Sequence, residues 1–482
     1  MERKQIHDIP KEERPAYHVS APTGWINDPN GFSIFQEQCH LFFQYHPFSK
    51  KWGPMHWGHC TSKDFIKWEY LPCALAPDKS YDEGGCYSGS AIEANGEHVL
   101  IYTGVIDRYL DDGFHYYRQV QCIAKGDGID YRKNEQNPVI TGESAPAGSS
   151  LEDFRDPKVW KEEDGYYLAA GSRSEDGSGQ ILLYRSQNLD QWEYVTVLDQ
   201  SRNKYGKMWE CPDFFPLGDK QILMVSPQDM RAFGLVFHNG SNSIFLYGQY
   251  DKKSHQFQRE KVTSVDYGLD FYAPQTLLTR DGRRILIGWM QSWDANITPV
   301  SFQWSGMMTI PRELTLEHGK IYQRPVKELE NYRTDMVRYD HLQITGATAL
   351  ENIQGRVLEL LLEITGFEFE HFQIRFARNH EYETFLQYSR RKECLTIDRT
   401  HSGIDRDVVC RRKMELAPME DENGKKVLKL RILLDKYSVE VFANDGEKVM
   451  SSLFYTPLEA DEIVFDCDQT AWVNIIKYSF EI

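Results

Sequence analysis

Three acidic residues lie in settings that suit chemistry. Asp28 lies in the stretch "WINDPNG", Asp156 in "FRDPKVW" and Glu210 in "WECPDFF". Each has a large aromatic residue nearby and a proline within two positions. A single carboxylate in such a turn is most often a capping group or an ion-pair partner. Three such settings in one chain favour a shared site.

Two carboxyl groups in an aromatic-rich cleft are what glycoside hydrolysis requires. One must be protonated to donate to the leaving oxygen, and the other must be ionised to attack the anomeric carbon. An apolar wall raises the pKa of the first group, and hydrogen bonds keep the second ionised. We therefore expect Asn27 and the turn amides to keep Asp28 ionised, and Trp209 to desolvate Glu210.

The elements that must position these carboxylates are short strands. From about residue 17 to 320, segments of four to eight residues such as "HLFFQYH", "GYYLAAGS" and "RILIGWM" alternate with Gly, Asp, Asn and Pro. Alternation and enrichment in aromatic and β-branched residues predict strands. Because no long helical pattern interrupts them, the region is predicted to be all-β.

The strand region repeats weakly. The segments 60–70 and 184–194 both place a serine six residues before a tryptophan, with an acidic turn between them. The segments 124–133 and 248–260 resemble worn copies of this pattern. Irregular β repeats at such intervals are typical of propeller blades, although an array of sandwiches could imitate them.

The remaining sequence predicts a second domain. "RPVKELENYR" has helical character, and after it come further alternating strands in which Trp and Pro become rarer. We expect a catalytic domain over 1–323, a linker helix over 324–337 and a β-sandwich over 338–482.

Composition excludes several classes of function. The formal net charge is −17 over 482 residues, which disfavours nucleic acid and anionic membranes as partners. The first 18 residues are charged and resemble no export leader, and no long apolar run follows. The nine cysteines contain no C-x-x-C pair, which favours free thiols in a reducing cytoplasm. His56 and His59 have no third partner at a metal-binding spacing, so neither a metal nor a cofactor is expected.

The three acidic stretches also match a known pattern. N-D-P-N-G at 27–31, R-D-P at 155–157 and E-C-P at 210–212 resemble, in this order, the signature blocks of glycoside hydrolase family 32, the β-fructofuranosidases. Further stretches resemble the family over nearly the whole chain, including "HLFFQYHP", "WGPMHWGH", "YSGSA", "DFYAPQ" and "LLDKYSVEVFANDG".

The resemblance implies an all-β fold, a five-bladed β-propeller followed by a C-terminal β-sandwich, with a funnel-shaped site on the propeller axis. It implies that Asp28 is the nucleophile of a retaining mechanism, that Glu210 is the acid/base and that Asp156 stabilises the transition state. It also implies a fructose pocket lined by Asn27, Gln44, Trp52, Ser88 and Arg155, with Tyr272 and Trp289 as further wall residues.

The expected partner is a small sugar: sucrose, sucrose 6-phosphate or a short fructo-oligosaccharide. A fructosyltransferase and a non-catalytic sugar-binding protein on the same fold are the alternatives, although a binding protein needs no acid/base pair. Lys50 and Lys51, beside Trp52, are either solvated or a clamp for a substrate phosphate. The β-2,1 or β-2,6 linkage preference and the choice between monomer and homodimer stay open.

Overall fold

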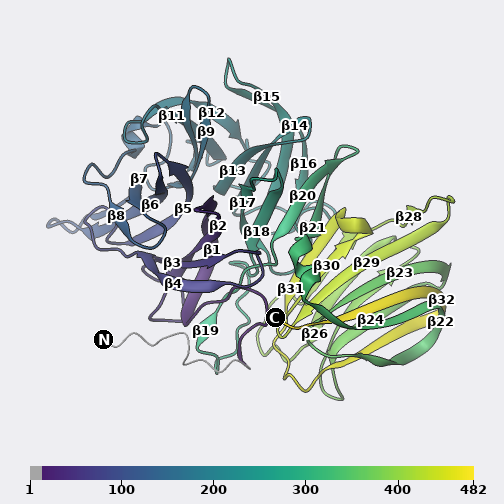
Figure 1. Ribbon diagram of the computed structural model, residues 1–482. Helices are drawn as coiled ribbons and strands as arrows, with labels where there is room; N and C mark the ends of the chain where they lie inside the picture. The colour runs from purple at the N-terminus through teal and green to yellow at the C-terminus, as the bar shows by residue number, and fades with distance from the viewer. Residues whose placement is uncertain (1–12) are drawn as a thin grey trace.

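The protein is described by a computed structural model that covers residues 13–482. Most of the N-terminal stretch considered above for an export leader lies outside these residues. Five small sheets surround a common axis, and an 11-stranded sheet follows them in the chain (Figure 1). The predicted fold class, a five-bladed propeller followed by a β-sandwich, is confirmed.

The first three blades take up the chain to residue 200. Blade 1 contains β1 (Gly24–Phe35), β2 (Gln38–His46), β3 (His56–Ser62) and β4 (Glu69–Leu75). Blade 2 contains β5 (Gly85–Ala94), β6 (Glu97–Tyr109), β7 (His115–Gly126) and β8 (Tyr131–Lys133), and a short 3-10 helix, η3 (Gly142–Ser144), follows it. Blade 3 contains β9 (Phe154–Glu162), β10 (Gly165–Arg173), β11 (Gly179–Ser186) and β12 (Glu193–Gln200).

The last two blades complete the ring. Blade 4 contains β13 (Trp209–Leu217), β14 (Lys220–Pro227), β15 (Ile244–Asp251) and β16 (Gln256–Ser264). Blade 5 contains β17 (Tyr272–Leu278), β18 (Arg284–Trp289), β20 (Arg312–Glu317) and β21 (Lys320–Pro325). Between β18 and β20, the short strand β19 (Trp304–Ser305) pairs in parallel with β1, so the last blade is joined to the first.

The weak sequence repeat corresponds to the turn between the third and fourth strands of a blade. In blade 1, the indole of Trp68 donates to the carbonyl of Phe65, and in blade 3 the indole of Trp192 donates to the carbonyl of Leu189. Phe65 and Leu189 both have a positive φ, of 63° and 71°. The two copies therefore fold alike, and the repeat does mark the blades.

The chain leaves the propeller through a single 3-10 turn, η4 (Lys327–Tyr332). It is shorter than the helix predicted over 324–337, because β21 continues to Pro325 and β22 begins at Arg333. The final sheet contains β22 (Arg333–Gln354), β23 (Leu358–Glu368), β24 (His371–Arg378), β25 (Glu383–Ser389), β26 (Cys394–His401), β27 (Arg411–Glu415), β28 (Met419–Glu420), β29 (Lys426–Asp435), β30 (Ser438–Ala443), β31 (Lys448–Leu453) and β32 (Glu462–Phe480), with a 3-10 turn, η5 (Asn444–Gly446), after β30.

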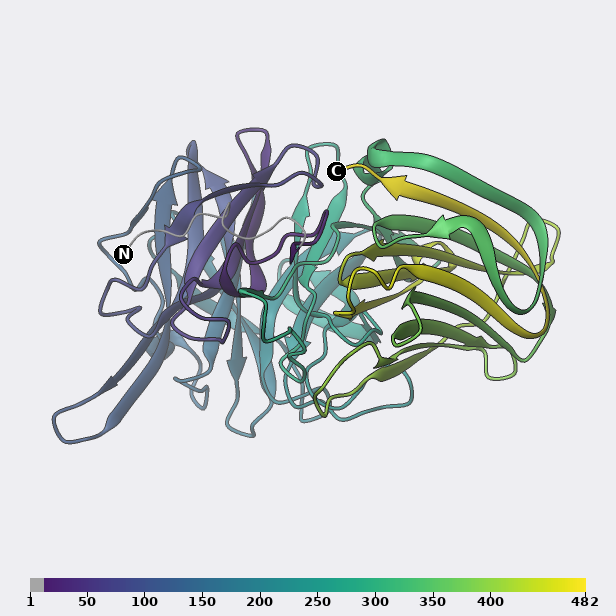
Figure 2. The same cartoon turned by 90° about the horizontal axis from the view of Figure 1, so that it is seen from below.

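The long strand β32 connects the two layers of the sandwich. Its first half pairs with β24 and its second half with β23, while β22 pairs along its whole length. Figure 2 shows these strands curving over one another beside the propeller. The apolar faces of the layers enclose a separate core that includes Ile374, Leu430 and Phe465.

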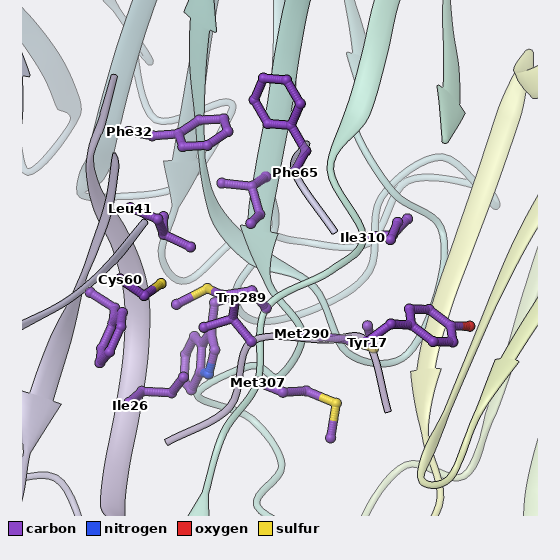
Figure 3. Close-up of a cluster of buried hydrophobic side chains, with 14 of the residues drawn as sticks. Tyr17, Ile26, Phe32, Leu41, Cys60, Phe65, Trp289, Met290, Met307 and Ile310 are labelled. Carbon is purple, nitrogen blue, oxygen red and sulfur yellow. The ribbon is translucent and has the colours of Figure 1, made fainter. Parts of the chain in front are cut away.

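The propeller and the sandwich share a second core. Tyr17, Ile26, Trp289 and Met307 belong to one buried cluster, shown in Figure 3. Phe442 and other side chains of the sandwich belong to the same cluster. Burial on this scale fixes the two parts against each other.

A buried polar network crosses the same junction. Arg312 of blade 5 donates to Glu440 of the sandwich at 2.6 Å, and the Nε2 atom of His18 lies 2.9 Å from Glu440. The Nδ1 atom of His18 lies 2.7 Å from Asp435. Burial alone would lower the pKa of His18, but hydrogen bonds to Asp435 and Glu440 raise it to about 9. The imidazolium therefore ties the N-terminal segment to the second domain.

Two further observations concern membrane-spanning helices and the state of the cysteines. Over the part of the chain that the structure describes, no helix is long and apolar enough to span a membrane. Seven of the nine cysteines are buried free thiols.

Candidate active site

The innermost strand of every blade is irregular at the same place. The register with the second strand shifts between Ile26 and Pro29 in β1, between Tyr87 and Gly89 in β5, beside Asp156 in β9, between Glu210 and Asp213 in β13, and between Tyr272 and Gln275 in β17. Such bulges re-aim side chains at the end of a sheet. In the middle of each bulge, directly before a proline or glycine, stand Asp28, Ser88, Asp156, Cys211 and Ala273. The five bulges therefore turn one residue per blade towards the axis.

Three of these five positions carry strained backbone. The φ angles are 65° at Asp156, 48° at Cys211 and 50° at Ala273, in the left-handed region that non-glycine residues rarely adopt. Backbone strain of this kind persists where the surrounding structure holds it in place, and it clusters at functional sites.

Beneath the bulges, polar side chains connect the blades. Lys158 forms an ion pair with Asp213 at 3.0 Å, and Asp213 also accepts from the backbone N–H of Thr276 at 2.6 Å. Gln275 donates to the carbonyl of Gly89 at 2.7 Å, and the backbone N–H of Gly89 donates to Asn30 at 3.2 Å. These contacts hold the five strands together below the site.

Asp28 is buried and hydrogen-bonded on both oxygen atoms. Ser88 donates to its Oδ2 atom at 2.6 Å, and the amide of Asn27 donates to its Oδ1 atom at 3.1 Å. Burial, and then the negative charge of Glu210, raises the pKa of Asp28 against these hydrogen bonds. The expected hydrogen bond from Asn27 is present and lowers the pKa of Asp28, although burial and the charge of Glu210 shift this pKa upward more strongly.

Asp156 lies close to Asp28. Its Oδ2 atom accepts from the backbone N–H of Cys211 at 3.0 Å, and the Cys211 thiol lies 3.6 Å from this atom and 3.5 Å from Oδ2 of Asp28. Burial raises the pKa of Asp156 to about 7, with Glu210 and Asp28 adding to the shift and Arg155 opposing it. Burial also raises the pKa of Cys211 far above its usual range, so the thiol between the two carboxyl groups stays protonated.

Glu210 is held by one cation and one phenol. The Nε atom of Arg155 donates to its Oε1 atom at 3.0 Å. The hydroxyl of Tyr272 lies 2.6 Å from Oε2 of Glu210 and 2.9 Å from the carbonyl oxygen of Ser226. When Glu210 is ionised, the phenol can donate to it. When Glu210 is protonated, it can donate to the phenol, which then donates to Ser226. Both protonation states are therefore accommodated without movement.

The three carboxyl groups face one cavity of about 400 Å³. This is at the small end of ligand sites, which span about 300–1,000 Å³. Its wall also carries Glu152 and Asp153, so Arg155 is the single cation against five acidic side chains. The cavity suits a small ligand that is neutral or becomes positive.

Most of the residues predicted to bind substrate line this cavity. Asn27, Gln44, Trp52, Ser88 and Arg155 all do, and Trp52 keeps 48 % of its surface exposed. Tyr272 is outside the lining and acts on the site through Glu210. Trp289 does not reach the cavity: it is fully buried and packs against Trp25.

Two other expectations differ from the structure. Trp209, expected to desolvate Glu210, lies in the core between blades 3 and 4 and is absent from the cavity wall. Neither Lys50 nor Lys51 is among the residues that line the cavity. The ammonium of Lys50 instead donates to the carbonyl of Val300 at 2.6 Å. The Lys50 ammonium is therefore not placed to clamp a phosphate on a ligand in the cavity.

Sequence reasoning missed several wall residues. Trp293, 40 % exposed, stands against Trp25 and occupies the wall position expected for Trp289. The other missed residues are Tyr117, Gln119, Glu152, Asp153 and Gln228. The exposed tryptophan in a loop was a readable signal, whereas the others lie in strands and turns without a distinctive pattern. In residues 13–482 there is no group of three or more His, Cys, Asp or Glu side chains arranged to hold a metal ion.

Comparison with known proteins gives consistent results. Residues 18–325 match the model of the "Glycosyl hydrolases family 32 N-terminal domain", and residues 328–478 match that of the "Glycosyl hydrolases family 32 C terminal". A sucrose-6-phosphate hydrolase and a raffinose invertase, both from Escherichia coli, are each 40 % identical to this chain, over 93 % of it and 91 % of their own length. A β-fructofuranosidase variant from Bombyx mori, solved in complex with sucrose, superposes with a TM-score of 0.85 at 34 % identity, covering 99 % of this chain and 96 % of its own.

Proposed function

The chain belongs to glycoside hydrolase family 32. From this premise we propose that it is a retaining β-fructofuranosidase acting on sucrose and short fructo-oligosaccharides. The observation that carries the proposal is the convergence of Asp28, Asp156 and Glu210 on one small cavity. Its relatives are named for hydrolysis of fructosides, and the Bombyx mori relative was solved with sucrose bound.

Asp28 attacks the anomeric carbon of the fructosyl unit, and the bond from that carbon to the glycosidic oxygen breaks. Glu210 gives its proton to this oxygen, so the leaving sugar departs as an alcohol. Glu210, now ionised, accepts a proton from water while the water oxygen attacks the same carbon and releases Asp28. The hydrogen bond between Tyr272 and Glu210 supports both states of this acid/base group.

Asp156 accepts hydrogen bonds from two hydroxyl groups of the fructosyl ring, and its carboxylate contributes negative charge. The raised pKa values of Asp28 and Asp156 show that the cluster resists full ionisation. A fructosyl ring that becomes positive in the transition state relieves this repulsion. The cluster therefore binds the transition state more tightly than the neutral sugar, which is the requirement for catalysis.

The charge of the cavity favours a neutral substrate. Five acidic side chains and one arginine line it, and Lys50 and Lys51 lie elsewhere. A phosphate on the substrate would add repulsion that no cation of the wall is free to offset. We therefore expect a preference for sucrose over sucrose 6-phosphate, or at most a small difference, although several relatives are named sucrose-6-phosphate hydrolases.

We assign the enzyme to the cytoplasm. We assign residues 13–325 to the catalytic domain, 326–332 to the linker and 333–482 to the sandwich. The seven buried free thiols agree with a reducing compartment. The active site needs no cofactor for the mechanism above.

A substrate panel tests the proposal. The wild type and Asp28→Asn should be compared by kcat/KM on sucrose, sucrose 6-phosphate, 1-kestose and inulin. Release of free fructose from sucrose by the wild type alone is the expected result. Tight sugar binding without release would instead identify a binding protein. Transfer products exceeding free fructose at high sucrose concentration would identify a fructosyltransferase.

A further inference from the structure

Exposed aromatic side chains are distributed unevenly over the molecule. Within residues 13–482, the strongly exposed ones are Phe48, Trp52, Tyr109, Phe114, Phe233 and Trp293. All six lie at connections between the second and third strands of propeller blades, or in the segment that follows β18. These connections lie at the end of the propeller where the cavity opens, since Trp52 and Trp293 line it. Aromatic surface is therefore concentrated around the cavity mouth.

One of these connections extends far beyond the others. The β6–β7 hairpin stands out from the body of the propeller (Figure 2). Its strands remain paired out to Tyr109 and His115. Tyr117, in the same hairpin, lines the cavity. Two residues along a strand cover about 7 Å, so the pair of Tyr109 and His115 lies roughly that far outward from Tyr117.

One face of the hairpin carries a row of rings. Side chains directly opposite each other and two residues apart share a face, which places Tyr117, His115 and Tyr109 on the same one. The ring centroids of His115 and Tyr117 are 6.2 Å apart, and those of Tyr109 and His115 are 4.9 Å apart and stacked. The Nε2 atom of His115 lies 2.7 Å from Asp107, which fixes the imidazole plane. Tyr109 remains 75 % exposed.

The row continues into the cavity wall. Tyr117 and Tyr87 both line the cavity, and the Tyr87 ring lies 5.8 Å from that of Trp52. The aromatic surface therefore runs from the cavity out to the hairpin tip without leaving the same side of the site.

Hydrogen bonds place this row beside the acid/base group. Arg155 donates to Glu210 at 3.0 Å and to Gln119 at 3.2 Å, and Gln119 donates to the hydroxyl of Tyr117 at 3.1 Å. Glu210 is the group that protonates the leaving oxygen. Tyr117 and the outer rings therefore flank the path along which the leaving sugar extends.

We propose that Tyr109 and His115 form an outer subsite that binds the sugar chain on the leaving-group side, beyond the first two sugar units. This rests on the proposed function and specifies its substrate class as neutral oligosaccharides of three or more units. Sugar rings present C–H faces that pack on aromatic rings, and a tyrosine offers this surface at low entropic cost. Sucrose ends inside the cavity and does not reach these rings, whereas 1-kestose and nystose extend outward.

The test compares the ratio of kcat/KM on nystose to kcat/KM on sucrose in the wild type, Tyr109→Ala and Tyr116→Ala. Tyr116 is the matched control, because it lies on the opposite face of the hairpin and packs between Arg108 and Arg118. We expect the ratio to fall about three- to tenfold in Tyr109→Ala, through a higher KM for nystose, and to stay unchanged in Tyr116→Ala.

Two outcomes overturn the subsite. The first is an unchanged ratio in Tyr109→Ala. The second is a ratio lowered equally in both variants, which would indicate a general effect on the hairpin. If the ratio is unchanged, a changed sedimentation coefficient in Tyr109→Ala would identify the hairpin tip as a contact between copies. A wild-type protein that cleaves neither substrate would refute the proposed function itself, and these failures are distinguishable.

Discussion

Replacing Asp156 with asparagine should stabilise the folded protein at neutral and alkaline pH while abolishing turnover. Asp156 is buried beside Asp28 and Glu210, and burial raises its pKa from 3.8 to about 7. Its ionised form is therefore disfavoured in the folded state. Asparagine keeps the carbonyl oxygen that accepts from the backbone N–H of Cys211 and removes the charge.

The magnitude follows from the pKa shift. A rise of about three units corresponds to about 4 kcal/mol of lost stability when the group is fully ionised. The neighbouring carboxyl groups can hold the proton in its place, so a gain of about 2 kcal/mol is expected in the variant at pH 8. Because the folded pKa is raised, the wild type keeps the stability below pH 4 and loses it as the pH rises through 7. The gain should therefore be absent at pH 4.

Urea unfolding at pH 4, 6 and 8, followed by tryptophan fluorescence, measures this directly. Glu152→Gln is the matched control, since Glu152 lines the same cavity but is exposed, and its loss should leave the unfolding midpoint nearly unchanged. An Asp156→Asn variant that is less stable than the wild type at pH 8, or equally stabilised at pH 4 and pH 8, would refute the account of the charge cluster.

Three further predictions follow from the contacts described. Glu210→Ala should lose about 10²–10⁴-fold in kcat on sucrose but retain turnover of an activated fructoside whose leaving group needs no proton, and equal losses on both would contradict its role as the acid. His18→Ala should cost about 3 kcal/mol in urea unfolding below pH 6.5, a cost that shrinks as the pH rises through about 9, where the wild-type imidazolium loses its proton; a pH-independent cost would contradict the buried ion pair. Trp293→Ala should raise the KM for sucrose with little change in Tm, whereas Trp289→Ala should destabilise the fold by about 3–5 kcal/mol, and the reverse pattern would contradict their placement.

The fold was largely predictable because its signals are local. Alternating aromatic and β-branched residues identified the strands, and the turn at Ser186–Trp192 repeats that at Ser62–Trp68 because both use the same indole-to-carbonyl hydrogen bond. The linker was harder to predict from the sequence. Its charged residues have helical propensity, but β21 and β22 pair with neighbouring strands up to both ends of η4, and tertiary pairing overrides local propensity.

At the site, the sequence predicted which carboxylates converge but not how they titrate. The pKa values of Asp28 and Asp156 depend on burial and on repulsion from neighbouring carboxylates, which only the three-dimensional cluster reveals. Trp289 illustrates a second limit. Both faces of β18 are covered, so nearly every residue of the strand is buried and alternation does not tell which side chain reaches the cavity. In the sequence, the five aligned bulges correspond to a residue followed by Pro or Gly in each innermost strand.

The central claim is that Asp28 becomes covalently bound to the fructosyl unit. Incubating Glu210→Ala briefly with an activated fructoside should allow attack but slow the release, because the base that activates water is missing. Acid quenching, proteolysis and mass spectrometry should then find one added fructosyl unit on the peptide that contains Asp28, and none in Asp28→Asn/Glu210→Ala. An adduct on another residue, or turnover that gives the inverted anomer without any adduct, would contradict the account.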